Sequence, residues 1–198
     1  MSHDGALARK VQELIDKQEI RDVLARYCRG VDRRDKSLIL SVYHANATDD
    51  YGTFRGGPQE LLQQNAAEPP GATVTASTHF VGNMLIQIDG ETAAAETYFL
   101  AIQERSIAGS VFTRVRAGRY VDALRKSDGV WRIASRKVVD DWSRMDEVAG
   151  PAFQTGRHRG QRTAADPSYE LAALKALSSP GTGSASGSAL SPSARSEE

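Results

Sequence analysis

The sequence lacks most features that mark secreted or membrane-spanning proteins. Only one of its 198 residues, Cys28, is a cysteine, so no intramolecular disulfide can form and a reducing, cytoplasmic setting is expected. No run approaches the ~20 apolar residues that cross a bilayer. The first ten residues, MSHDGALARK, have no apolar core of the kind found in signal peptides. We therefore expect no membrane partner.

An excess of charge of either sign is also missing. Lys and Arg together number 25 and are balanced by 25 Asp and Glu, which gives a net charge of zero. Nucleic-acid-binding proteins usually carry a strong positive excess. We therefore expect no nucleic-acid partner.

Metal and cofactor motifs are absent as well. Asp49 and Asp50 lie near His44, but the sequence has no His pair at helical spacing, no His-x-His and no cysteine cluster. The Gly-rich segments GTFRGGP and SPGTGSASG fit neither a phosphate loop nor a dinucleotide fingerprint, and no Gly-x-Ser-x-Gly elbow occurs. We expect no metal and no cofactor.

The chain divides into three parts by composition. Residues 178–198 consist mostly of Ser, Gly, Ala and Pro, and such a segment buries too little apolar surface to fold, so we predict a disordered tail. The predicted folded domain covers residues 6–145, and residues 146–177 form a C-terminal extension. The stretch PAFQTG at 151–156 is apolar enough to cap a pocket.

Helical periodicity dominates the N-terminal third. Apolar residues recur at a spacing of 3.6, which predicts one long helix or two short ones over residues 6–31. A second helix is expected at 36–43, and a third starts at Pro58 and stops at Pro69-Pro70. The apolar stripes of the first two predicted helices comprise Leu7, Val11, Leu14, Ile15, Ile20, Val23, Leu24, Tyr27, Cys28, Val31, Leu38, Ile39, Val42 and Tyr43.

The period then changes to two, which indicates β-strands. Asp-Gly pairs at 89–90 and 128–129 predict tight hairpins. Long strands are expected at about 74–88, 92–105, 110–126 and 130–142, with a short one at 48–51. Helices followed by an antiparallel meander predict an α+β fold, in which helices pack on a curved sheet and leave a cone with a pocket for a small ligand.

Two polar residues stand out on these elements. His79 lies early in the first long strand, on a face where polar and apolar residues mix, which suits either a pocket wall or a solvated surface. Asp32 ends the first helix beside its apolar stripe, where it faces the negative end of the helix dipole. It could pair with Arg29, Arg33 or Arg34, or it could meet His79 and support a general base.

Three further side chains are candidates for a pocket. Tyr27, on the apolar stripe, and Tyr51, in DDYGTF, each carry a phenol that can donate a proton or a hydrogen bond, although ordinary packing also explains Tyr27. Arg136 lies between apolar neighbours in WRIASRKVV, so it either reaches into a cavity or extends to solvent.

Four segments together resemble the SnoaL-like branch of the nuclear transport factor 2-like superfamily. They are QEIRDVLARYCRGVDRRD, SVYHANATDDYGTFRGGP, THFVGNMLIQIDGETAAAETYFLA and AGRYVDALRKSDGVWRIASRKVVDDW. The match spans about residues 10–145 in the family's order. It implies a cone-shaped α+β barrel, with N-terminal helices packed on a curved antiparallel sheet that encloses a pocket.

Within that branch the chain resembles three families of lyases: scytalone dehydratase, hexachlorocyclohexane dehydrochlorinase and bile-acid dehydratase. The resemblance implies a catalytic pair of Asp32 and His79, with Tyr51 and Tyr27 as active-site phenols and Arg136 as a substrate-binding residue. Gln103 stands where scytalone dehydratase has a second histidine, and Tyr27 stands where the dehydrochlorinase has a lysine. Neither substrate is therefore implied.

The expected function is a cofactor-independent lyase that acts on a small, cyclic, apolar substrate. The same residues could instead isomerise a double bond or close a ring. The fold also hosts non-catalytic ligand-binding and assembly modules. The resemblance further implies a homo-oligomer, most often a trimer joined through the convex sheet faces.

Overall fold

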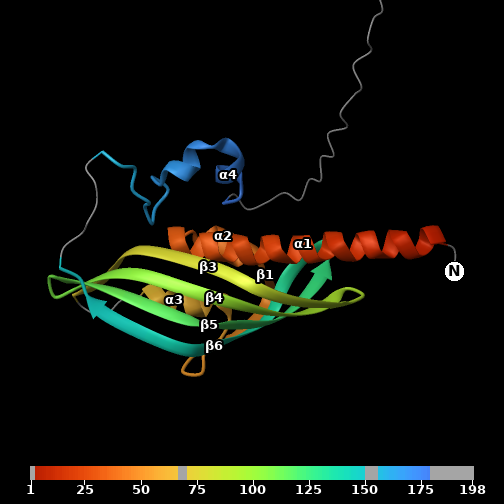
Figure 1. The fold of residues 1–198 in the computed structure, drawn as a ribbon, viewed down its shortest axis with the longest axis horizontal. Helices are drawn as coiled ribbons and strands as arrows, with labels where there is room; N and C mark the ends of the chain where they lie inside the picture. Colours follow the sequence, from red (N-terminus) through yellow and green to blue (C-terminus); the bar gives the residue numbers. More distant parts are fainter. Residues whose placement is uncertain (1–2, 67–70, 150–155, 179–198) are drawn as a thin grey trace, which may run out of the picture.

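The computed structural model describes residues 3–66, 71–149 and 156–178, and it shows helices packed on one curved sheet (Figure 1). The helices are α1 (His3–Arg33), α2 (Lys36–Ser41), α3 (Pro58–Ala66) and α4 (Ala172–Ala176), with a 3-10 turn η1 (Pro167–Glu170). The strands are β1 (Tyr43–Asp50), β2 (Arg55–Gly56), β3 (Ala72–Asp89), β4 (Thr92–Ile107), β5 (Ser110–Ser127) and β6 (Val130–Glu147).

The four long strands form the predicted antiparallel meander. Strands β3 to β6 follow one another in the sheet in chain order. At the turn between β5 and β6, Asp128 and Gly129 both have positive φ, 53° and 74°, as the tightest two-residue hairpins require. The turn between β4 and β5 has the same character at Ala108 and Gly109, with φ of 49° and 89°. The predicted α+β class is confirmed.

The remaining strands extend the sheet at its other side. The order is β2-β1-β6-β5-β4-β3, and β1 runs parallel to β6. The sheet is curved but does not close. The prediction placed the second helix at 36–43 and the short strand at 48–51. The helix instead ends at Ser41 and β1 begins at Tyr43. The reason is that Tyr43 pairs with Ile133 of β6, and the backbone amide of Ile133 donates a hydrogen bond to the backbone oxygen of Val42.

Helix α1 is a single long helix whose C-terminal half packs on the sheet. Ile20 and Leu24 are fully buried there. The N-terminal half carries the predicted apolar stripe, but Leu7 and Leu14 are 58% and 67% exposed. This half continues past the sheet (Figure 1), so the periodicity predicted the helix correctly but did not indicate that its first half is exposed.

A bulge in β3 reverses which residues face the helices. The pairing with β4 shifts between Gly82 and Leu85, and Asn83 adopts φ 45° at that point. Before the bulge His79 faces inward and Phe80 is 61% exposed, whereas after it Leu85 is 61% exposed and Ile86 is buried. The one-residue shift explains why neither simple alternation of β3 is apolar throughout.

The described part of the C-terminal extension returns to the end of α1. Residues 156–178 lie beside α2 and the C-terminal end of α1 (Figure 1), and the Tyr169 hydroxyl donates to Asp35 at 2.9 Å. Most of the predicted capping stretch PAFQTG and nearly all of the predicted tail lie outside the described residues. Among the helices that are described, none is long and apolar enough to cross a membrane.

Candidate active site

A cavity of about 530 Å³ lies between the helices and the inner face of the sheet. Its walls come from elements far apart in the chain, because the curved sheet and α1 enclose the space between them. Three of the predicted site residues, Tyr27, Tyr51 and His79, line it. A volume of this size accommodates a small organic molecule.

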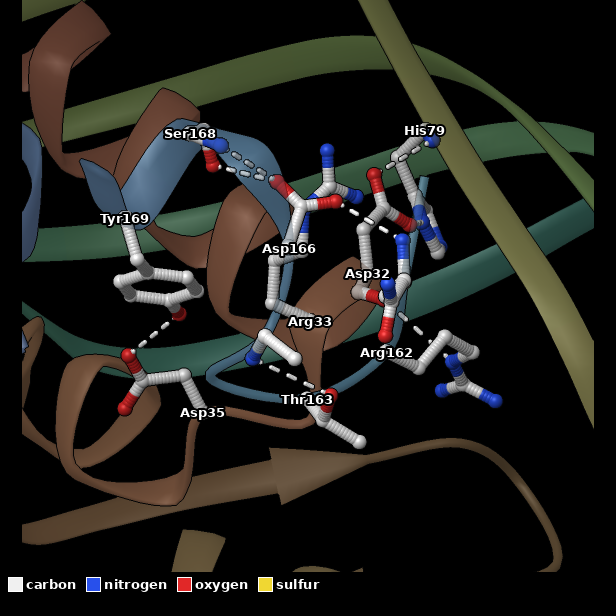
Figure 2. A network of polar contacts seen from close by, with 11 residues as sticks. Asp32, Arg33, Asp35, His79, Arg162, Thr163, Asp166, Ser168 and Tyr169 are labelled. Carbon is white, nitrogen blue, oxygen red and sulfur yellow. Dashed lines mark hydrogen bonds and ion pairs between the residues drawn. The ribbon is translucent and has the colours of Figure 1, made fainter. Parts of the chain in front are cut away.

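Asp32 and His79 meet at the wall of this cavity. Asp32 Oδ1 lies 2.6 Å from His79 Nδ1, and both side chains are about nine-tenths buried, with exposed fractions of 11% and 8%. Asp32 Oδ2 also accepts from the backbone amide of His79 at 3.0 Å. The Ser77 hydroxyl donates to Oδ1 at 2.9 Å. Of the partners that the sequence left open for Asp32, the structure selects His79 (Figure 2).

These contacts fix the protonation pattern of the pair. Burial opposes ionisation of Asp32, but the hydrogen bonds and charge of His79, together with the Ser77 hydroxyl, hold the pKa of its carboxyl below the ordinary value. An ionised carboxylate only accepts hydrogen bonds, so Nδ1 of His79 must carry the proton. Nε2 is then the basic nitrogen of the neutral ring.

Arg162 completes the surroundings of Asp32 from the C-terminal extension. Its guanidinium donates to the backbone oxygens of Val31 and Asp32, at 3.2 and 3.3 Å, and to that of Val74 on β3 at 3.2 Å. The side chain thereby supplies donors to the last carbonyls of α1, where a cation is favoured. One arginine thus joins the end of α1 to β3, beside the carboxylate and the imidazole.

A second contact holds this segment in place. Asp166 is 4% exposed and forms an ion pair with Arg33, with Nε and Oδ2 3.1 Å apart (Figure 2). It also accepts hydrogen bonds from the amides of Gln161 and Ser168. Although burial opposes ionisation, the bonds from Ser168 and Gln161 and the charge of Arg33 lower the pKa of Asp166 to about 2. Neither Arg162 nor Asp166 was predicted, because nothing in the local sequence indicates where this segment docks.

Tyrosines form the inner end of the cavity. The hydroxyls of Tyr27 and Tyr51 lie 3.0 Å apart, and the Tyr27 ring packs edge-on against Tyr43 and Tyr120. Burial raises the pKa of Tyr27 and holds that of Tyr51 well above its ordinary value. Both phenols therefore stay protonated at neutral pH and remain able to donate.

Asp49 lies in the same region and was not predicted as a site residue. Its side chain is fully buried, lines the cavity and accepts a hydrogen bond from the Tyr43 hydroxyl at 3.1 Å. Burial, only partly offset by the charge of Arg136, raises its pKa to about 6. Groups of three or more metal-ligating side chains are not found in the described ranges, so Asp49 has no such cluster around it there.

Arg136 occupies a different position from the predicted one. Its guanidinium is completely enclosed and makes two 2.7 Å hydrogen bonds to Asp122. The charged group packs against the rings of both Tyr27 and Tyr120, 4.1 and 4.2 Å from their centroids. It is not part of the cavity lining. Arg136 therefore lies behind the tyrosines, and the prediction that it contacts substrate directly does not fit this structure.

Three arginines line the outer end of the cavity instead. Arg105 on β4 and Arg114 and Arg116 on β5, called the outer arginines below, are all half-buried. They occupy alternate positions of their strands, which place them on the inner face. The alternation was visible in the sequence, but which face looked inward was not. Gln103 lines the cavity beside them.

Comparison with known proteins agrees with this architecture. The family model described as "SnoaL-like domain" matches residues 12–137. No protein with a curated description matches the sequence.

Solved structures show the same fold at low sequence identity. A type 2 hexachlorocyclohexane dehydrochlorinase is 17% identical, with 74% of this chain and 98% of that chain covered and a TM-score of 0.61. A candidate scytalone dehydratase from Novosphingobium aromaticivorans is also 17% identical, with 76% and 99% covered and a TM-score of 0.60. A protein of unknown function from Mycobacterium tuberculosis is 22% identical, with 84% and 88% covered and a TM-score of 0.55.

The family model covers well over half of the chain, in the part that holds most of α1, most of the meander, Asp32 and His79. The structural neighbours share the helices and the curved sheet along nearly their whole length. The chain therefore belongs to the SnoaL-like domain family, with the nuclear transport factor 2-like fold.

Proposed function

We propose that this protein is a cofactor-independent lyase of the dehydratase type, in which His79 is the general base. The observation that carries the proposal is the 2.6 Å contact between Asp32 and His79 at the wall of the cavity. A buried carboxylate that orients an imidazole is a recurrent arrangement for proton abstraction. The substrate would be small, cyclic and largely apolar.

The proposed reaction removes water from adjacent carbons. Nε2 of His79 takes the proton from a carbon next to an activating carbonyl, and the electron pair left behind forms the new double bond as the C–O bond breaks. Tyr51 or Tyr27 gives its proton to the departing hydroxyl, which leaves as water. The imidazolium then returns a proton to the phenolate, and Asp32 stabilises the charged ring while it exists.

General-base catalysis of this kind increases the reaction rate by about 10²–10⁴-fold. Fixed dipoles in the cavity must supply the rest of the rate enhancement. The buried phenols suit that role, because burial keeps them protonated and they can donate to developing negative charge on a carbonyl oxygen.

The experiment measures dehydration of cyclic β-hydroxy ketones, beginning with 3-hydroxycyclohexanone, by mass spectrometry. We expect a product lighter by one water, total loss of turnover in His79→Ala and nearly total loss in Asp32→Asn. His44→Ala is the matched control, because His44 is buried outside the cavity and bonds to the Arg125 carbonyl.

Three outcomes would contradict this proposal. Full activity in a folded His79→Ala would exclude the general base. A product of unchanged mass would indicate isomerisation or ring closure with the same residues. A His79 ring that neither titrates nor responds to any ligand by NMR would favour a structural pair in a non-catalytic module.

We also propose that copies of the chain associate through the outer face of the sheet, most simply as a trimer. Phe80, Leu100, Ala117 and Trp142 are cross-strand neighbours on that face. Phe80 and Trp142 are 61% and 54% exposed, and a continuous apolar row of this kind is typical of an interface. Sedimentation analysis should show an oligomer that Trp142→Glu dissociates, and a monomeric wild-type chain would contradict the proposal.

A further inference from the structure

The outer end of the cavity concentrates positive charge in a chain whose net charge is zero. Arg105, Arg114 and Arg116 line it from the sheet, and Arg34 and Lys36 line it from the end of α1 and the start of α2. Within the described residues, Asp49 is the one carboxylate-bearing side chain that lines the same cavity. Such an imbalance raises the local concentration of anions.

The outer arginines are poorly compensated by the protein itself. Arg116 donates to Asp140 at 2.6 Å. Over residues 3–66, 71–149 and 156–178, neither Arg105 nor Arg114 has a hydrogen bond or an ion pair. Partial burial and the charges of Arg116 and Arg105 lower the pKa of Arg114. Like charges held together away from water destabilise a fold unless a ligand compensates them.

The register of the sheet relates these arginines to His79. Ala101 pairs with His79 on one side and with Arg116 on the other, so His79 and Arg116 are two strands, or about 10 Å, apart. His79 and Arg116 both line the cavity. Arg114 lies two residues before Arg116 on β5, about 7 Å from it along the strand.

We infer that the substrate carries a carboxylate, which the outer arginines bind while the ring of the substrate reaches His79. This inference rests on the proposed function only in taking the reacting molecule to be the occupant of this cavity. Guanidinium groups bind carboxylates through paired, charge-assisted hydrogen bonds. The backbones of Arg116 and His79 are about 10 Å apart across the sheet, so the carboxylate is held away from the carbon that loses its proton and does not itself activate that carbon.

The test compares two probes of nearly the same shape, 4-cyclohexylbutanoate and its neutral carboxamide, by isothermal titration calorimetry. In the wild-type chain at low salt we expect the carboxylate to bind at least about tenfold more tightly than the amide. The preference should decrease as salt is added. Equal affinity for the two probes would overturn the inference.

Substitutions then locate the anion. Arg114→Gln and Arg105→Gln should each weaken carboxylate binding about tenfold and leave amide binding unchanged. Arg144→Gln is the matched control, because it removes the same charge from a side chain that is 70% exposed and paired with Asp146 outside the cavity. If Arg144→Gln weakens the carboxylate as much as Arg114→Gln does, general charge explains the effect and the inference fails.

Binding and turnover separate this inference from the proposed function. His79→Gln should abolish turnover and keep the preference for the carboxylate, because the imidazole does not contact the anion. If the wild-type protein prefers the carboxylate probe but has no lyase activity, only the proposed function is contradicted. If it has lyase activity but does not prefer the carboxylate probe, only the inference of a substrate carboxylate is contradicted.

Discussion

The two ends of the cavity differ in how their charged side chains are paired. Behind the tyrosines of the inner end, Arg136 is completely enclosed and bonds twice to Asp122. At the outer end, Arg105 and Arg114 are half-buried and make no ion pair with the described residues. A fully buried charge destabilises a fold unless it is paired. A half-buried arginine is partly hydrated, so it can remain without an ion pair and bind an anionic ligand. The pair of Arg136 and Asp122 therefore serves stability, and the outer arginines are available for binding.

The largest effect expected from this difference is on stability. Asp122→Ala leaves Arg136 buried without its carboxylate and should lower the free energy of unfolding by about 3–5 kcal/mol. Asp140→Ala, which unpairs Arg116 at the outer end, should cost about 1 kcal/mol or less, because that pair is partly hydrated. Urea unfolding, followed by the fluorescence of buried Trp131, measures both. Equal costs would show that the two ends do not differ in this way.

A pH-dependent effect of about 3 kcal/mol or less is expected at Asp49. Its pKa is raised from 3.8 to about 6. Between these two pH values, Asp49 of the folded chain keeps a proton that Asp49 of the unfolded chain has lost. Folding is therefore penalised fully above about pH 6, and the penalty disappears as the pH falls toward 4. Asp49→Asn should raise stability at pH 8 and change it little at pH 4.

The neighbouring Asp50 provides the control for that prediction. Its pKa is lowered by the backbone amide of Gly52 and by Arg55, so Asp50→Asn should not stabilise the protein at pH 8. Urea unfolding at the two pH values compares the variants. A stability gain for Asp49→Asn that is independent of pH would show that its carboxylate is not the source of the penalty.

The smallest effect on global stability is expected at Arg162, which joins the C-terminal extension to the end of α1. Arg162→Ala removes the donors to Val31, Asp32 and Val74 and should cost about 1–2 kcal/mol. Amide hydrogen exchange should increase at residues 72–79 and 156–178, while the β5–β6 hairpin stays protected. Arg162→Lys keeps the charge but cannot reach three carbonyls, so it should behave like the alanine variant. Unchanged exchange in both variants would contradict this role.

Much of the secondary structure could be predicted because its causes are local. The spacing of Ile20, Val23 and Leu24 identifies α1, and the Asp128-Gly129 pair identifies a hairpin. The same reasoning overestimated the length of α2. Tyr43 pairs with Ile133, a residue 90 positions away in the sequence, and this pairing competes with the local helix propensity. It also did not show that Leu7 and Leu14 are exposed, since periodicity indicates an apolar face but not what covers that face.

The sequence by itself determined the existence of the three N-terminal helices, the long strands, the α+β class and the position of Asp32 at the end of a helix. Tertiary structure decided the rest. The contact between Asp32 and His79 joins residues 47 positions apart, Arg162 reaches the site from the C-terminal extension, and the bulge at Asn83 sets which side of β3 faces inward. Local patterns depend on neighbouring side chains along the chain, whereas these contacts depend on strand register and docking, which only the complete fold specifies.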